Sequence, residues 1–501
     1  MALRSRWSIP RFTSNSLAYF TLCTLAFYLG AMLSACSQRA QLPTVAVIPD
    51  VEMTSAPGPG QSGGELPREL ADVRQGPLLL ERAIEEALRA SPELRQIEER
   101  ISAASEQVRQ AESAFYPRLV VSEEYNVTDN PVYALMNIIN QRRLQPTVNF
   151  NEPGQQQNYS SRIRGEWNLL EGGSRWFDRS GAMNRQRSLD AELQGGRNQL
   201  VSKVTETYYR WLQALGFIGV AEKALESAQT DERLGEARLR VEMALPGEVA
   251  RLKARSAEAH GNLVSARTGV RKLQAALERL LARPIRPEEV PDPALTSSLP
   301  PPEELEEDTG SLVRRALDQR PEMGAVRSLI DAALDRVRSA QGELLPKLGA
   351  NAQYQWDSEA FIASAESWMI GVQATWPLFE GGVTSSKIRE ARAHLKELEA
   401  RGEQVSLDIA LEVRHAVLAV REAAEKIQVA EERRMWAQKA LDEVRNLYRN
   451  EMATVDSLLQ AEVAWNQAEV SYAAALFEGK IAQALLKRSL GDFAETVGDS
   501  R

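Results

Sequence analysis

The chain contains the same short phrase twice, WNLLEGG at residues 167–173 and WPLFEGG at residues 376–382, 209 residues apart. Apolar positions downstream repeat at that spacing, whereas upstream ALRASPEL at 87–94 matches ALDQRPEM at 316–323 with an offset of 229 residues. The first copy therefore holds twenty extra residues, between Pro117 and its phrase. Self-similarity of this length predicts an internal tandem duplication, so the fold should consist of two versions of one unit.

Each copy continues into a long segment without proline, residues 173–244 and 382–452. A helix of about 70 residues spans about 105 Å at about 1.5 Å per residue, which is longer than a compact domain needs. The apolar positions alternate steps of four and three, which is typical of coiled-coil packing, and many are alanine. Residues 248–283 and 456–490 are predicted to run back, so that each copy forms a helical hairpin.

Four shorter segments alternate apolar and polar residues with a period of two: 118–125, 162–169, 350–356 and 368–376. This pattern indicates strands with one face toward lipid and the other toward water, the alternative being soluble hairpins packed on helices. Four strands do not close a barrel, and an open edge leaves backbone groups unpaired in lipid. Several chains should therefore share one barrel.

The N-terminus has the pattern of an export signal, because arginines precede an apolar run over residues 17–33. The sequence Leu33-Ser34-Ala35-Cys36 resembles the bacterial lipoprotein signal, in which the cysteine is acylated and becomes the new N-terminus. We therefore expect a signal peptide over 1–35 and lipid attachment at Cys36, the alternative being a plain secretory peptide or an uncleaved anchor.

Composition argues against several other classes of protein. The formal net charge is −9, which gives no electrostatic reason to expect nucleic acid. Only two cysteines occur, both within the first forty residues, and the three histidines are scattered. We therefore expect no metal site, no cofactor and no catalytic site, and hence no enzyme.

Stretches rich in proline and glycine divide the chain. The predicted units are listed here in order: a lipid-anchored linker over 36–77, the first repeat over 78–285, a proline-rich equatorial linker over 286–309, the second repeat over 310–491 and a tail over 492–501.

Three duplicated motifs carry a family resemblance: the Pro-Glu helix start at Pro92 and Pro321, the strand-entry proline at Pro117 and Pro346, and the phrase W-x-L-x-x-G-G. Together they resemble the outer-membrane efflux protein family of TolC-like channels, in its lipoprotein branch. The resemblance implies an α+β membrane protein: a homotrimeric outer-membrane β-barrel of four strands per chain and twelve in total. A long periplasmic α-helical coiled-coil barrel would continue it.

The resemblance also implies a function. The chain would be the outer-membrane channel of a tripartite efflux system in a Gram-negative bacterium, docked on a periplasmic membrane-fusion adaptor and an inner-membrane pump. It would be a passive exit duct for drugs, metals or other small solutes. One alternative is the channel of a type I protein secretion system, and another is a periplasmic coiled-coil adaptor lipoprotein without a pore.

Three groups of site residues follow from the resemblance. The strand-to-helix bends should need glycine, with tryptophan at the bilayer interface: Trp167, Gly172, Gly173, Trp376, Gly381 and Gly382. The hairpin tips should dock the adaptor: Ala244, Leu245, Pro246, Gly247, Glu451, Met452, Ala453 and Thr454. An acidic periplasmic gate should lie at or beside the family's gate positions: Asp456, Ser457, Gln460 and Glu462.

Two expectations leave alternatives open. The turn glycine of the family corresponds to Glu451 in the second copy and to Ala244 in the first, but the first turn aligns at an offset of either 209 or 207 residues. The twenty extra residues of the first copy should lie in an extracellular loop, which either partly caps the outer mouth or is an idle surface loop.

Overall fold

The computed structural model describes residues 76–291, 307–361, 364–450 and 452–492. They belong to one compact unit, Gln75–Arg501, to which the following description refers. Two predicted site residues, Cys36 and Glu451, lie outside the described residues.

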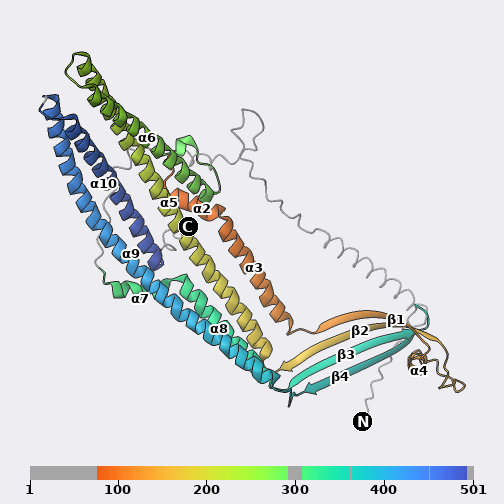
Figure 1. The fold of residues 1–501 in the computed structure, drawn as a ribbon. Helices are drawn as coiled ribbons and strands as arrows, with labels where there is room; N and C mark the ends of the chain where they lie inside the picture. The colour runs from red at the N-terminus through yellow and green to blue at the C-terminus, as the bar shows by residue number, and fades with distance from the viewer. Residues whose placement is uncertain (1–75, 292–306, 362–363, 451, 493–501) are drawn as a thin grey trace, which may run out of the picture. The chain divides into compact units, whose positions relative to one another are not determined.

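Four antiparallel strands form one sheet in the order β1 (Arg118–Thr128), β2 (Gln156–Glu171), β3 (Lys347–Ser358) and β4 (Ala365–Thr375) (Figure 1). The four strands predicted from the period-two alternation are thus confirmed. β2 pairs with β3, so strands from both halves of the chain share the sheet. β1 and β4 are its two edges.

Two helices of 67 residues each dominate the helical part, α5 (Ser174–Arg240) and α9 (Val383–Arg449). After a short turn, α6 (Pro246–Leu281) packs back along α5 and α10 (Val455–Leu490) packs back along α9. We call α5 with α6 the first hairpin and α9 with α10 the second hairpin. Both hairpins match the helices predicted from the proline-free segments to within a few residues.

Shorter helices complete the unit. α2 (Leu80–Ala90) and α3 (Pro92–Ser113) pack along α5, α7 (Thr309–Gln319) packs along α9, and α8 (Pro321–Gly342) lies between α5 and α9. A 3-10 turn, η3 (Pro287–Glu289), follows α6. Within the described ranges, no helix combines the length and the apolar character that crossing a membrane requires.

The core lies along the helices and repeats the predicted apolar positions. One cluster surrounds the fully buried Trp211 of α5 and includes Leu200, Val204 and Leu277. A second surrounds the fully buried Val413 of α9, with Ile409 and Val420 among its members. The three-and-four spacing of these residues keeps them on one side of each long helix, which is why they pack there.

A short helix, α4 (Pro131–Asn140), forms in the segment between β1 and β2, for which we predicted only a loop. Pro131 stands at its first position, and the side chain of Asn130 accepts hydrogen bonds from the backbone N–H groups of Val132 and Tyr133. Both are standard helix-start signals, so the sequence did contain a local indication of this helix.

Candidate functional site

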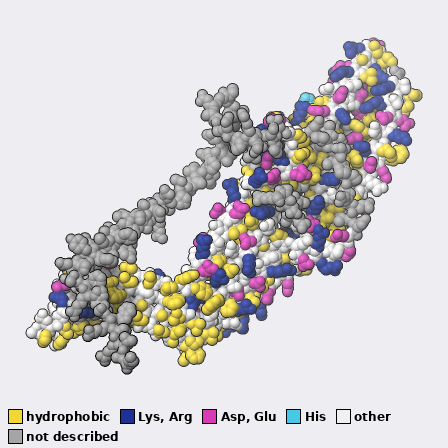
Figure 2. All heavy atoms as spheres, turned by 180° about the vertical axis from the view of Figure 1, so that it is seen from behind, with side chains coloured by type: hydrophobic (Ala, Val, Ile, Leu, Met, Phe, Trp, Pro, Cys, Tyr) yellow, Lys and Arg dark blue, Asp and Glu magenta, His cyan; other side chains and the backbone are white. Residues whose placement is uncertain are grey.

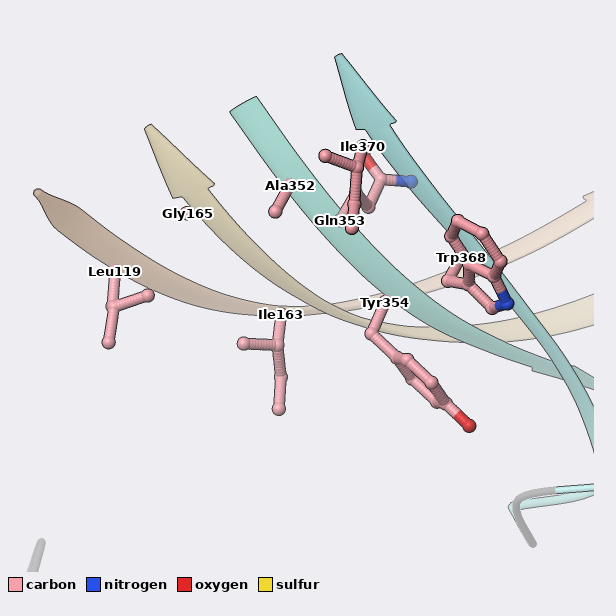
Figure 3. Close-up of a pocket in the computed structure, with 8 residues that line it drawn as sticks. All are labelled: Leu119, Ile163, Gly165, Ala352, Gln353, Tyr354, Trp368 and Ile370. Atoms are coloured by element: carbon pink, nitrogen blue, oxygen red, sulfur yellow. The ribbon is translucent and has the colours of Figure 1, made fainter. Parts of the chain in front are cut away.

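The sheet has one apolar and one polar face. Leu119, Ile163, Tyr354, Trp368 and Ile370 line a shallow groove on the apolar face (Figure 3). Trp368 and Ile370 are 72% and 73% exposed, so the described part of the chain does not cover this face. Hydrophobic side chains gather over the sheet, whereas charged side chains are spread over the helices (Figure 2).

The opposite face carries polar side chains that contact one another. Arg162 donates from Nε to Oε1 of Gln355 at 3.0 Å and lies 3.1 Å from a carboxylate oxygen of Glu124. Gln353 and Gln355 are hydrogen-bonded along β3. A sheet with one bare apolar face and one hydrated face can separate lipid from water.

The strand-to-helix bends contain four glycines, and all have positive φ: 59° and 84° at Gly172 and Gly173, 61° and 88° at Gly381 and Gly382. Gly173 and Gly382 are the residues that precede α5 and α9. Residues with a Cβ rarely adopt this conformation, which gives the double glycine its physical role.

The tryptophan of each phrase makes a structural contact at the bend. Trp167 donates from Nε1 to the carbonyl of Phe115, and Trp376 donates in the same way to the carbonyl of Leu344, each at 3.0 Å. Both acceptors lie just ahead of the preceding strand. The tryptophan therefore ties the end of one strand to the start of its neighbour.

The turn of the first hairpin has its left-handed residue at Glu242, with φ of 60°. The predicted position was Ala244, two residues later, which does not have positive φ. The offset of 209 residues, which aligns Glu242 with Glu451, therefore describes this turn better than the offset of 207. No local signal marked Glu242, because glutamate has no preference for this conformation.

The hairpin tips expose apolar side chains. Leu245 and Met452 are 68% exposed, and the neighbouring Val241 and Met243 are nearly as open. Pro246 and Gly247 begin α6, Ala244 and Ala453 are partly buried, and Thr454 precedes α10.

The four predicted gate residues have different environments. Asp456 accepts from Arg251 of α6, with Nη1–Oδ2 of 2.6 Å, which links the two hairpins. The hydroxyl of Ser457 lies 2.9 Å from that of Thr454, and Gln460 is exposed. Glu462 is buried, unlike the other three.

Glu462 lies in a polar cluster between the hairpins. Its Oε1 accepts from the hydroxyl of Ser227 on α5 at 2.9 Å and from Arg445 on α9 at 3.1 Å. One turn further along α5, burial raises the pKa of the Asp231 carboxyl to about 7. A hydrogen bond from Glu462 and its charge raise this pKa as well, against the lowering effect of Arg445 and Arg449.

Apolar packing joins the tips next to this cluster. Leu252 of α6 packs with Leu441 and Tyr448 of α9 and with Leu458 of α10. The guanidinium of Arg238 lies 4.8 Å from the ring centroid of Tyr448. Sequence reasoning missed Arg238, Arg251, Ser227, Asp231 and Arg445, because in a helix rich in charge nothing local distinguishes a residue that contacts a partner about 200 positions away.

Comparison with known proteins places this geometry. The family described as outer membrane efflux protein matches residues 83–283 and 312–492. The curated protein CyaE of Bordetella pertussis is 27% identical over 359 residues, which are 69% of this chain and 70% of that protein.

Solved structures of outer-membrane channels share the fold. VceC of Vibrio cholerae has a TM-score of 0.68 at 19% identity, over 82% of this chain and 96% of that one. The Campylobacter jejuni outer membrane channel CmeC has a TM-score of 0.71 at 15% identity, over 82% and 85% of the two chains. The predicted family is thus confirmed: this chain belongs to the outer membrane efflux protein family, whose TolC-like channels lie in the outer membrane of Gram-negative bacteria.

Proposed function

We propose that this protein is the outer-membrane channel of a tripartite efflux system and works as a passive exit duct for small solutes. Three copies would join their sheets into one twelve-stranded barrel, continued by a tube of the long hairpins. The family and the fold are those of channel proteins, which are not enzymes.

The observation that carries this proposal is the open sheet with two different faces. Its apolar face is exposed, its polar face is hydrated, and β1 and β4 are unpaired at their outer edges among the described strands. In lipid, every unpaired backbone group costs free energy, so the sheet needs other chains to pair with both edges. A periplasmic adaptor without a pore has no use for such a sheet.

The hairpin tips support a docking role. They expose Val241, Met243, Leu245 and Met452 at the end of the helices far from the sheet. Exposed apolar side chains at a tip suit contact with another protein, here a periplasmic adaptor attached to an inner-membrane pump. Acylation at Cys36 would hold the chain to the outer membrane in addition.

The predicted gate becomes a proposal about contacts between hairpins. Asp456 with Arg251, and Glu462 with Ser227 and Arg445, hold the two hairpins of one chain together near the tips. Opening the periplasmic end requires the hairpins to move, and these contacts resist that movement.

Single-channel recording of the purified protein in a planar bilayer tests the proposed function, with oligomer size measured by light scattering. We expect trimers and discrete conductance steps. Monomers that never conduct would contradict the shared barrel and favour a protein without a pore. Transport of labelled small solutes against labelled polypeptide in cells would separate efflux from protein secretion.

A further inference from the structure

Helix α4 lies on the polar face of the sheet, at the end of the strands opposite to α5 and α9 (Figure 1). Asn137 of α4 donates to the side chain of Asn126 on β1 at 2.9 Å. Gln141, directly after the helix, donates to the side chain of Asn158 on β2 at 2.9 Å. Both acceptors share the strand face of Arg162, because they stand an even number of residues from it or from its partner.

The contact is a fixed structural one. Asn158 is almost fully buried and donates onward to Asp357 of β3 at 2.8 Å, so the network crosses three strands. Arg142 donates to the carbonyl of Glu366 on β4 at 2.6 Å, and Arg143 pairs with Glu359 at 2.9 Å. These bonds set both the position and the rotation of α4.

This rotation leaves an apolar face pointing away from the sheet. Ala134, Asn137 and Ile138 are buried against the strands. On the other side of the helix, four large side chains are 41–67% exposed: Val132, Tyr133, Met136 and Ile139. The helix PVYALMNIIN contains no charged residue. An idle loop in water would be expected to present polar groups there.

We propose that α4 forms an apolar restriction at the outer mouth of the channel, an inference that rests on the proposed function. In the trimeric barrel the polar face of each sheet borders the lumen, so three copies of α4 stand on its wall with their apolar faces toward the axis. A helix is about 10 Å wide, so three of them take up much of the lumen. An apolar constriction excludes hydrated ions by dewetting.

A polar variant of α4 tests the restriction by single-channel conductance. The triple variant Val132→Thr, Met136→Gln, Ile139→Thr keeps the side-chain volumes similar and removes the apolar surface. We expect its conductance to rise by roughly twofold or more, because water and ions would fill the mouth. The control is Val127→Thr, at the same end of the sheet but on the apolar face, for which the conductance should not change.

A cysteine variant tests the same point without altering the apolar face as a whole. Residues 37–501 contain no cysteine, so Met136→Cys and Val127→Cys each introduce a unique thiol there. A cationic, water-soluble thiol reagent added on the outer side should reduce the conductance of Met136→Cys channels by at least half and leave Val127→Cys channels unchanged.

The outcomes separate this inference from the function on which it rests. Wild-type trimers that conduct, with conductance unaffected both by the triple variant and by the reagent at Met136→Cys, would overturn the restriction and leave the channel standing. Wild-type protein that never conducts would overturn the proposed channel and the restriction with it.

Discussion

At the scale of single residues, the bends show how the same sequence phrase acquires different mechanical loads. Gly172 and Gly381 occupy matching positions and have nearly the same φ, 59° and 61°. A Cβ built on Gly172 would lie 2.1 Å from the carbonyl oxygen of Gly342, whereas one built on Gly381 meets nothing within 4 Å. The first bend therefore needs glycine for both its φ and its space, and the second for its φ alone.

This difference predicts unequal effects of one substitution. Gly381→Ala should cost about 1 kcal/mol, the typical penalty of a left-handed residue with a Cβ. Gly172→Ala should cost clearly more, because backbone atoms of α8 must also move. Thermal unfolding followed by helical circular dichroism at one scan rate would show the larger drop for Gly172→Ala. Equal drops would mean that the close approach of Gly172 to Gly342 contributes nothing.

At the scale of elements, the first and second hairpins are joined by a buried polar cluster. Glu462 of α10 accepts from Ser227 of α5 and from Arg445 of α9, and Asp231 of α5 lies beside it. Two carboxyl groups near one guanidinium pack best when one of them holds a proton. The strength of this contact should therefore depend on pH.

The sign follows from the pKa of Asp231. Its ordinary value is 3.8 and its value in the fold is about 7, so the folded protein holds the proton more tightly. This carboxyl group is best tolerated below pH 3.8, and stability is lost as the pH rises toward 7, by at most a few kcal/mol. Above pH 7 no further loss is expected from this group.

We expect the melting midpoint of the wild-type protein to fall between pH 5 and pH 7.5 relative to that of Asp231→Asn, which has no proton to lose. Asp442→Asn, an exposed site on α9, is the matched control and should follow the wild type. Parallel pH profiles for wild type and Asp231→Asn would show that Asp231 does not titrate in this range.

At the scale of the whole molecule, the proposed channel depends on how the described parts of the chain meet one another and further copies. The open sheet predicts a shared barrel, α4 predicts a restricted outer mouth, and the tips predict a closed periplasmic end. Each is a property of an assembly and is measured best as conductance.

The pair Arg251–Asp456 gives the prediction for the periplasmic end. Arg251→Ala or Asp456→Ala removes a link between the hairpins and should raise the single-channel conductance or the fraction of time spent open. Glu422→Ala, which breaks the exposed pair with Lys426 inside α9, should behave as the wild type. Unchanged channels in both hairpin variants would show that this pair does not restrain the opening.

Local patterns in the sequence determined much of the fold. Periodicity alone predicted the four strands and the two 67-residue helices, since burial of one side repeats along each element. The double glycines marked the bends for a similar reason, because their requirement is set by the backbone at that point. Where a local signal went unused, as with Asn130 and Pro131 before α4, the prediction missed an element.

The tertiary structure alone decided which side chains meet. Sequence reasoning chose Asp456 and Glu462 as members of an acidic gate, but the structure gives each a cationic partner, Arg251 and Arg445. It also placed α4 on the polar face of the sheet and the left-handed turn residue at Glu242. These outcomes depend on contacts between distant segments, or on the strain that a closed turn imposes, and neither leaves a periodic trace in the sequence.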